Sequence, residues 1–404
     1  MAKKATLPSG WIGVKLGDVA KKCTAKNNDF KYSLVLTNSA QRGVIPQTEH
    51  FDKDIAVDTN IDVYYVVDDG AFVYNPRTSV TAPCGPIRRN HLGITGVMSP
   101  LYTVFQVKTN IIYDAFFEYF LLSSSWHRYI KSIANYGARH DRMSITDTKF
   151  FAMPIPLPPI AEQKRIAEIL TTQDRLIAAK ARLIVAKKKQ KKWLIRILLR
   201  GHTYVKLKSL CAIFCDGDWI ESKDQSNDGI RLIQTGNIGV GQFINKEEKK
   251  HYISSKTFQR LNCTSVIAGD VLISRLPAPA GRACIVPTTK ERMITAVDCT
   301  IVRFIHYNPI LFVGYTQTAN YQKQIDILLA GSTRQRISRN ELGKVKVPVL
   351  SSKKQTIIAE QLTAADKEIE LLERELEQQR HVKKYLMRQL LTGKIRVKGA
   401  KNDD

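Results

Sequence analysis

Two short segments of the sequence combine arginines with glycine and serine. They are GARHDRMS at 137–144 and GSTRQRIS at 331–338, and in both an arginine precedes a serine by two residues. Arginine binds phosphate and pairs with guanine through two parallel hydrogen bonds. The chemistry that these residues offer is recognition of a polyanion.

The usual catalytic motifs are absent from the sequence. No G-x-x-x-x-G-K-[ST] loop occurs, because TGK at 392–394 lacks the first glycine and the following hydroxyl residue. No glycine-rich turn for S-adenosylmethionine is present, and Asn75-Pro76-Arg77 only approaches the motif of amino-methyltransferases. The acids of 366–377 have the spacing of a helix surface, whereas a metal nuclease needs carboxylates clustered beside a lysine. We therefore expect no catalytic residue and no cofactor in this chain.

Cysteine and histidine spacing does not predict a metal site. The seven cysteines show no C-x-x-C pair, and Cys211 and Cys215 are not followed by a second ligand pair at zinc-site spacing. The opening MAKKATLPSGW lacks the apolar stretch of a secretory signal, and no apolar run is long enough to span a bilayer. We expect a cytoplasmic protein with reduced thiols and no membrane contact.

The net charge indicates the class of partner. Sixty-two Lys and Arg against 37 Asp and Glu leave +25 on 404 residues. Such a charge can serve solubility, a membrane surface or an acidic protein. Nucleic acid is the favoured partner, because Lys and Arg near phosphates release condensed counterions.

The chain contains an internal repeat of roughly 190 residues. At a shift of 192 residues, IAEIL (166–170) aligns with IAEQL (358–362), and KKWLIRILLRG (191–201) aligns with KKYLMRQLLTG (383–393). About twenty of fifty positions in this region are identical. The two arginine-bearing segments align at a shift of 194. A duplication accounts for these matches better than chance does.

Each unit of the repeat begins with a mixed pattern. Strand signals occur at 64–74 and 99–107 in the first unit and at 229–239, 265–275, 282–287 and 298–305 in the second. Helical segments are expected at 111–133 and 308–329. We predict an α+β fold in which two repeated mixed domains are separated by an antiparallel coiled coil of two helices, with internal pseudo-twofold symmetry.

Each unit ends in a long helix whose apolar residues recur in alternating steps of four and three, the spacing of a coiled-coil seam. Pro158 and Pro159 suit the start of the first helix, a capping box of Ser352 and Gln355 suits the second, and both end at glycine, Gly201 and Gly393. The predicted seam residues are Ile166, Leu170, Ile177, Ile184, Leu194, Leu198, Ile358, Leu362, Ile369, Leu372, Leu376, Leu386 and Leu390. Polar residues interrupt the seam: Gln173, Lys180, Lys187, Lys191, Gln379 and Lys383.

Charge favours pairing of the two long helices. Residues 160–200 carry 12 basic and 3 acidic side chains, whereas 366–377 carries six acids against Lys367 and Arg374. A basic helix and an acidic-centred helix suit antiparallel packing, with the polar positions fixing register. The alternative is that both helices present solvated faces without mutual contact.

These features together resemble the specificity subunit of type I restriction–modification systems, over essentially the whole chain. PLPPIAEQKRI (156–166) is similar to the family's entry into its first conserved helix, and the arginine-bearing pair is similar to the segment that closes each target recognition domain. TGNI (235–238) and GDVLISR (269–275) resemble recurrent elements of such domains. The second unit departs from the pattern, with PVLSS at 348–352 and a more acidic helix.

The resemblance implies a subunit that is not itself an enzyme. It implies two recognition domains that each contact one half of a bipartite DNA target, and helices that set the spacer and dock two methyltransferase subunits and, through them, restriction subunits. Those partners are expected to use S-adenosylmethionine, ATP and Mg²⁺. The implied domains are 1–155, 202–347 and the helices 156–201 and 348–393, with a tail at 394–404.

Candidate DNA contacts follow from the preference of Arg for guanine and of Asn or Gln for adenine. In the first domain they are Arg88, Arg89, Asn90, Arg139 and Arg142, and in the second they are Gln234, Thr235, Asn237, Arg275, Arg282, Arg334 and Arg336. Each is alternatively a surface arginine or a turn residue, and Asn237 between two glycines suits a turn.

Two other functions remain open. The chain is alternatively a self-contained nuclease or DNA-modifying enzyme with an unrecognised site. It is also compatible with a coiled-coil protein whose basic lobes bind nucleic acid without sequence preference.

Overall fold

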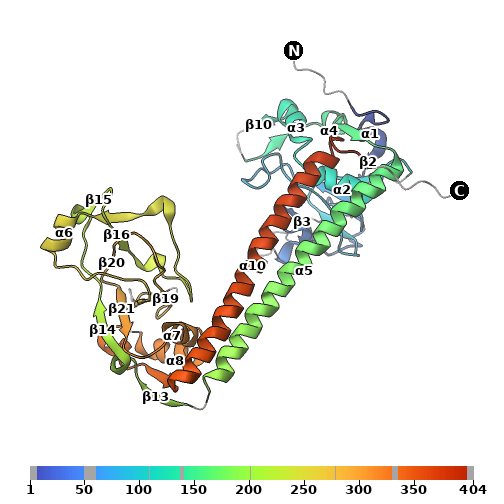
Figure 1. Cartoon of the computed structure of the whole chain (residues 1–404). Helices are drawn as coiled ribbons and strands as arrows, with labels where there is room; N and C mark the ends of the chain where they lie inside the picture. Colours follow the sequence, from blue (N-terminus) through green and yellow to red (C-terminus); the bar gives the residue numbers. More distant parts are fainter. Residues whose placement is uncertain are drawn as a thin grey trace. The chain divides into compact units, whose positions relative to one another are not determined.

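The computed structural model describes residues 7–49, 61–108, 110–136, 141–200, 202–277, 279–329 and 335–397. They form two compact units, unit 1 from 1–179 and 376–404 and unit 2 from 180–375. Each unit combines one globular domain of mixed helix and sheet with part of both long helices (Figure 1). The α+β class and the two repeated domains are therefore as predicted.

Unit 1 is built around a four-stranded antiparallel sheet of order β2-β9-β6-β7. Two-stranded pairs β1-β12, β3-β4, β5-β8 and β10-β11 surround it. The elements before the long helix are β1 Ile12–Lys15, α1 Leu16–Val19, β2 Ala20–Lys22, β3 Leu36–Ser39, β4 Gly43–Pro46, η1 Gln47–Glu49, β5 Tyr65–Val67, β6 Phe72–Tyr74, β7 Ile87–Arg89, β8 Gly96–Met98, β9 Thr103–Val107, α2 Asp114–Leu122, α3 His127–Ile133, β10 Asn135–Tyr136, β11 Met143–Ser144, α4 Asp147–Phe151 and β12 Pro154–Leu157.

Unit 2 has the equivalent antiparallel sheet, β14-β21-β18-β19, and a second four-stranded sheet, β15-β17-β16-β20. Strand β13 pairs with β22 as β1 does with β12. Its elements are β13 Thr203–Lys206, η3 Leu207–Leu210, β14 Cys211–Asp216, η4 Ser222–Asp224, β15 Gln225–Ser226, β16 Ile230–Ile233, η5 Thr235–Asn237, η6 Glu247–Lys249, β17 His251–Ile253, α6 Ser255–Arg260, β18 Val271–Ser274, β19 Ala283–Ile285, β20 Met293–Thr295, β21 Cys299–Phe304, α7 Pro309–Thr316, α8 Ala319–Leu328, α9 Arg339–Leu342 and β22 Lys346–Val349.

The predicted helices 111–133 and 308–329 are each two helices. In unit 1, α2 ends at Leu122 and the Ser123 side chain bonds the carbonyl of Phe120, which closes the last turn. In unit 2, α7 ends at Thr316 and Thr318 caps the start of α8 by accepting from Tyr321 N–H. The prediction of one helix was wrong because hydroxyl residues at these points offer the backbone alternative partners.

The long helices are α5, Ile160–Leu198, and α10, Ser352–Leu390, each of 39 residues. The predicted seam residues are all buried or half-buried, from Ile166 to Leu390. Toward the end of α5 the buried face shifts by one residue, so that Ile195 and Leu199 are more buried than Leu194 and Leu198. Ile195 and Leu199 join the core of unit 2.

The polar positions in the seam have partners across the helix pair. In unit 1, Lys383 pairs with Asp174 at 2.6 Å and Gln379 bonds Gln173. In unit 2, the basic residues of α5 pair with the acids of α10: Lys180–Glu375, Lys187–Glu368, Lys188–Glu373 and Lys191–Asp366. Within each unit the two helix segments are thus in contact, and the alternative of separate solvated helices is wrong.

The start of each long helix is held by a glutamine in a way that the sequence did not predict. Gln163 accepts from Tyr113 N–H and donates to the carbonyl of Pro158, both at 2.8 Å. Gln355 does the same with Asn308 N–H and the carbonyl of Leu350. The capping box predicted for Ser352 and Gln355 was therefore wrong, because the Gln355 amide bonds to residues outside the helix.

The core of unit 1 lies between the central sheet, α2 and the helix pair, and it is rich in aromatic rings. Phe72 stacks on Phe105 and meets Phe117 edge-on, with ring centroids 5.6 and 5.2 Å apart.

The described part of the chain contains no helix with both the length and the apolar content needed to cross a membrane.

Candidate nucleic-acid interface

The two arginine-bearing segments occupy equivalent places in the two domains. In unit 1, Met143 N–H donates to the carbonyl of Pro76, just beyond β6, at 3.0 Å. In unit 2, Ile337 N–H donates to the carbonyl of Arg275, just beyond β18, at 3.1 Å. Both segments therefore return to the end of an equivalent central strand, β6 in unit 1 and β18 in unit 2. Arg142 lies beside the first strand end and Arg336 beside the second.

A hollow borders each of these segments. In unit 1 a cavity of about 510 Å³ is lined by Lys22, Tyr102 and Arg142 among others. In unit 2 a cavity of about 430 Å³ is lined by Trp219, Asp218 and Arg336 among others. Arg336 also pairs with Asp298 at 3.2 Å.

Seven of the predicted DNA contacts are half-exposed: Arg88, Arg89, Arg142, Gln234, Thr235, Arg282 and Arg336. Gln234 and Thr235 lie at the turn after β16, and Arg142 and Arg336 lie beside the cavities. Arg139 and Arg334 fall outside the described residues. The structure thus places Arg142 and Arg336 at equivalent strand ends and, in unit 2 alone, Gln234 and Thr235 at a turn.

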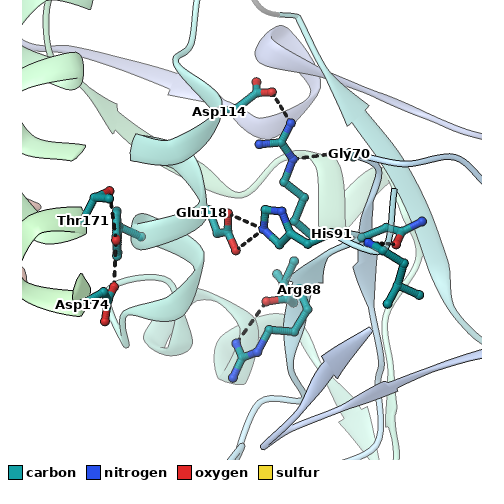
Figure 2. A network of polar contacts seen from close by, with 12 residues as sticks. Gly70, Arg88, His91, Asp114, Glu118, Thr171 and Asp174 are labelled. Atoms are coloured by element: carbon teal, nitrogen blue, oxygen red, sulfur yellow. Dashed lines mark hydrogen bonds and ion pairs between the residues drawn. The ribbon is translucent and has the colours of Figure 1, made fainter. Parts of the chain in front are cut away.

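The prediction for Asn90 was wrong, and Arg89 is half-exposed and bonds Gly70 and Asp114, which are labelled in Figure 2. The Asn90 side chain is fully buried and donates to the carbonyls of Asp68 and Ile94. Arg89 donates to Gly70 and pairs with Asp114 of α2 at 2.6 Å. These bonds hold the loop after β7 in place, and the buried Asn90 side chain has no free edge for a base. Direct base contact by Arg89 stays a prediction.

Asn237 and Arg275 are also internal. Asn237 accepts from Gln234 N–H and donates to Ile244 at 3.0 Å each, so it stabilises its own turn. Arg275 is 3 % exposed and bonds the carbonyls of Val297 and Ile337. The prediction of direct DNA contact was wrong for both, because these side chains are buried and bond to the protein itself.

Arg88 and Arg282 direct their guanidinium groups at main-chain carbonyls. Arg88 donates to Ala40 and Ile87, at 2.8 and 3.2 Å, and Arg282 makes five such bonds. Burial lowers the pKa of both guanidinium groups, and likewise that of Arg275. Both side chains are half-exposed, and direct base contact by either of them stays a prediction.

The exposed residues at these places include several that the sequence did not single out. Gln41 and Arg42 lie exposed at the tip of the β3-β4 hairpin, where Gly43 has a φ of 77°. In unit 2, Trp219 is 68 % exposed beside its cavity, and the Lys246 ammonium lies over Gly236. The signal for the hairpin tip was the polar SAQRG between two apolar runs.

Acid, histidine and thiol groups form no metal-ligand cluster among the described residues. No three His, Cys, Asp or Glu side chains there gather closely enough to hold a metal ion. The cysteines are free, and burial raises the pKa of Cys284 to about 12. Burial also raises the pKa of Asp218, against the hydrogen bond from Thr264 N–H.

Comparison with known proteins relates the chain to DNA specificity subunits. The family model for the type I restriction modification DNA specificity domain matches residues 8–186 and 200–379. The chain is 26% identical over 425 residues to the type I restriction enzyme MjaVIII specificity subunit of Methanocaldococcus jannaschii, covering 97% of this chain and 94% of that protein. It is 30% identical over 300 residues to the putative MjaX specificity subunit of the same organism, covering 69% and 68%.

Solved structures share the fold. A chain from a study of complex assembly and conformational transition of the type I R-M system has a TM-score of 0.61 at 16% identity, covering 97% of this chain and all of that chain. The type I restriction-modification S subunit from M. genitalium has a TM-score of 0.52 at 13% identity, covering 96% and 98%.

Proposed function

The chain belongs to the type I restriction modification DNA specificity domain family, and from this premise we propose that it is the subunit that reads the DNA target of a restriction–modification complex. Each domain contacts one half of a bipartite target. The observation that carries this proposal is the family match over both repeats together with the equivalent placement of Arg142 and Arg336. The chain contributes recognition and no catalytic residue.

The two half-sites differ in sequence under this proposal. Unit 1 presents the β3-β4 hairpin, whereas unit 2 presents a turn attached to a four-stranded sheet. Different side chains at the two places meet different base edges, which produces an asymmetric target.

The partners are double-stranded DNA, two methyltransferase subunits and restriction subunits bound through them. The helix pair carries exposed apolar side chains suited to docking, such as Leu176, Leu183 and Trp193 on α5 and Tyr385 on α10. The methyltransferase and restriction subunits supply the chemistry, with S-adenosylmethionine, ATP and Mg²⁺ as their cofactors.

Sequencing of methylated bases in the host genome tests the function. Deletion of this gene is expected to abolish methylation of one bipartite motif, and reintroduction restores it. An unchanged methylation pattern contradicts the proposal. Turnover of DNA by the purified chain alone with Mg²⁺ and S-adenosylmethionine contradicts the assignment as a subunit without catalysis.

Substitution of the two equivalent arginines tests the proposed interface. R142A and R336A are each expected to weaken binding of the target duplex by about 1–3 kcal/mol, the typical contribution of a base-contacting arginine. The measurement is fluorescence anisotropy with the cognate duplex and a scrambled duplex. R128A, at an arginine without ion pairs in the described residues, is the control, and equal losses in all three variants contradict the interface.

A further inference from the structure

In each unit an arginine side chain bonds the main chain of a turn that carries exposed or half-exposed polar residues. In unit 1 the turn is 39–43, between β3 and β4, and in unit 2 it is 234–239, which contains η5. Each turn has half-exposed or exposed side chains, Gln41 and Arg42 in the first and Gln234 and Thr235 in the second. Neither turn is part of the central sheet of its unit.

Arg282 ties turn 234–239 to a second loop. Its Nε and Nη2 donate to the carbonyls of Ile238 and Thr235, at 2.6 and 2.8 Å. Its Nη1 donates to Leu276 at 3.1 Å, Pro277 at 3.4 Å and Pro279 at 2.8 Å, all in the loop between β18 and β19. One side chain therefore sets the separation of the two loops.

Arg88 holds the corresponding turn of unit 1. Its Nη2 donates to the carbonyl of Ala40 at 2.8 Å, and its side-chain carbons lie 4.0 Å from the point where a Cβ on Gly43 would stand. The guanidinium group can be followed in Figure 2, where it bonds back to the carbonyl of Ile87. The arginine thus bonds Ala40 in the hairpin tip and lies beside Gly43 at its other end.

The two arginines do not occupy equivalent positions. Arg88 pairs with Val73 of β6, and the residue in that place in unit 2 is Cys284, opposite Leu272 of β18. Arg282 corresponds instead to Pro86. The carbonyl of Pro86 accepts from Asn75 N–H and the carbonyl of Arg282 accepts from Ser274 N–H, and Asn75 and Ser274 each lie two residues after the paired Val73 and Leu272. Duplication of one ancestral domain would place the two arginines at equivalent positions. It therefore does not by itself explain why arginines at different positions support a turn in each unit.

We infer that Arg88 and Arg282 are positioning residues for sequence readout, each holding the turn whose exposed side chains meet the bases. This inference rests on the proposed function. The fixed donor geometry of a guanidinium bonds several carbonyls at once, whereas a lysine ammonium on a flexible stem does not fix their relative positions. Specificity of a half-site therefore depends on an arginine that does not itself contact DNA.

The test replaces each arginine by lysine in the host and determines the methylated motif by sequencing. R282K is expected to relax one half of the motif at least tenfold, measured as methylation of sites with one mismatch, and R88K is expected to relax the other half. R303K is the control, because Arg303 makes a bidentate pair with Asp270 in the central sheet of unit 2 and contacts neither turn. It is expected to leave both halves strict.

A folded R282K or R88K protein with an unchanged motif overturns the inference, and so does equal relaxation of both halves. If R282K does not fold, as judged by its thermal unfolding, R88K carries the test, since that side chain makes only two hydrogen bonds. If deletion of the gene itself leaves methylation unchanged, the proposed function fails, which is a result distinct from an unchanged motif in the variants.

Discussion

At the scale of residues, the presence of an arginine in the sequence did not distinguish a candidate DNA contact from a side chain that bonds main-chain carbonyls of the protein. Arg142 and Arg336 are half-exposed at equivalent strand ends, whereas Arg275 and Arg282 use their donors on carbonyls. Buried carbonyls need donors, and a buried guanidinium can satisfy several of them. Under the proposed function, the arginines of this chain therefore divide between those that contact DNA and those that hold the loops of the interface in place.

The raised pKa of Asp218 predicts a pH dependence of stability. Because burial favours its protonated form in the folded protein, the contribution of this carboxyl to stability is fully present below its ordinary pKa and is lost as pH rises through the raised value. D218N removes this loss. The difference in Tm between D218N and the unmodified chain is expected to increase between about pH 4 and pH 7.

Thermal unfolding across this pH range measures the effect. D228N, at an exposed carboxylate in the same unit, serves as the control and is expected to show no such trend. A difference that stays constant with pH would show that burial of Asp218 does not disfavour its ionised form.

At the scale of elements, the start of each long helix is bonded to the globular domain of its unit. Gln163 and Gln355 each join a helix start to the domain helix that follows the central sheet. The packing of the domain helix on the long helices differs between the units. In unit 1, Tyr119 of α2 bonds Thr171 and Asp174 of α5. In unit 2, Gly314 of α7 lies close to Leu362 of α10. Equivalent helices therefore pack on the pair by polar contacts in unit 1 and by close approach in unit 2.

Removal of the Gln355 side chain tests the anchor. Q355A leaves Asn308 N–H and the carbonyl of Leu350 without their partner, and Gln355 is buried. We expect the free energy of unfolding to fall by about 2 kcal/mol. Denaturant unfolding compared with Q361A, at an exposed position of the same helix, checks this, and an equal effect of both substitutions argues against the anchor.

Exchange of a cross-helix pair tests the charge pairing. K191D and D366K each place like charges together, and each is expected to lower the free energy of unfolding by about 1 kcal/mol. The double variant K191D/D366K restores most of that loss, because the opposite charges are merely exchanged. A double-mutant cycle measures the coupling, which should decrease at high salt. Additive effects of the two substitutions would mean that the pair does not interact.

At the scale of the whole molecule, charge and duplication act together. The +25 net charge supplies attraction to phosphates without sequence preference, and the two domains supply two separate readouts. Binding therefore combines a strong electrostatic contribution with specificity from a few side chains in each unit.

DNA binding by the whole chain is expected to depend steeply on salt. With about six to ten phosphate contacts over two half-sites, the affinity should fall by about 10³–10⁵ between about 50 and 200 mM salt. Fluorescence anisotropy with one duplex over a salt series measures the slope. A nearly constant affinity would show that the basic surface is not where DNA binds.

The sequence by itself determined the repeat, the two long helices, their seam and the pairing of a basic with an acidic helix. These features follow from the period of apolar residues along the chain and from matches at a constant shift, so they can be found without knowing which distant residues meet. The seam from Ile166 to Leu390 and the pairing of Lys191 with an acid of α10 follow from that pattern, whereas the Lys383–Asp174 pair does not.

Only the tertiary structure decided which candidate residues face outward. Arg282 is directed inward by carbonyls of Thr235 and Ile238, more than forty positions earlier in the chain. Asn90 is buried by the carbonyls of Asp68 and Ile94, which no periodic pattern brings together. Burial and hydrogen bonding depend on which segments meet after folding, and a linear pattern does not contain that information.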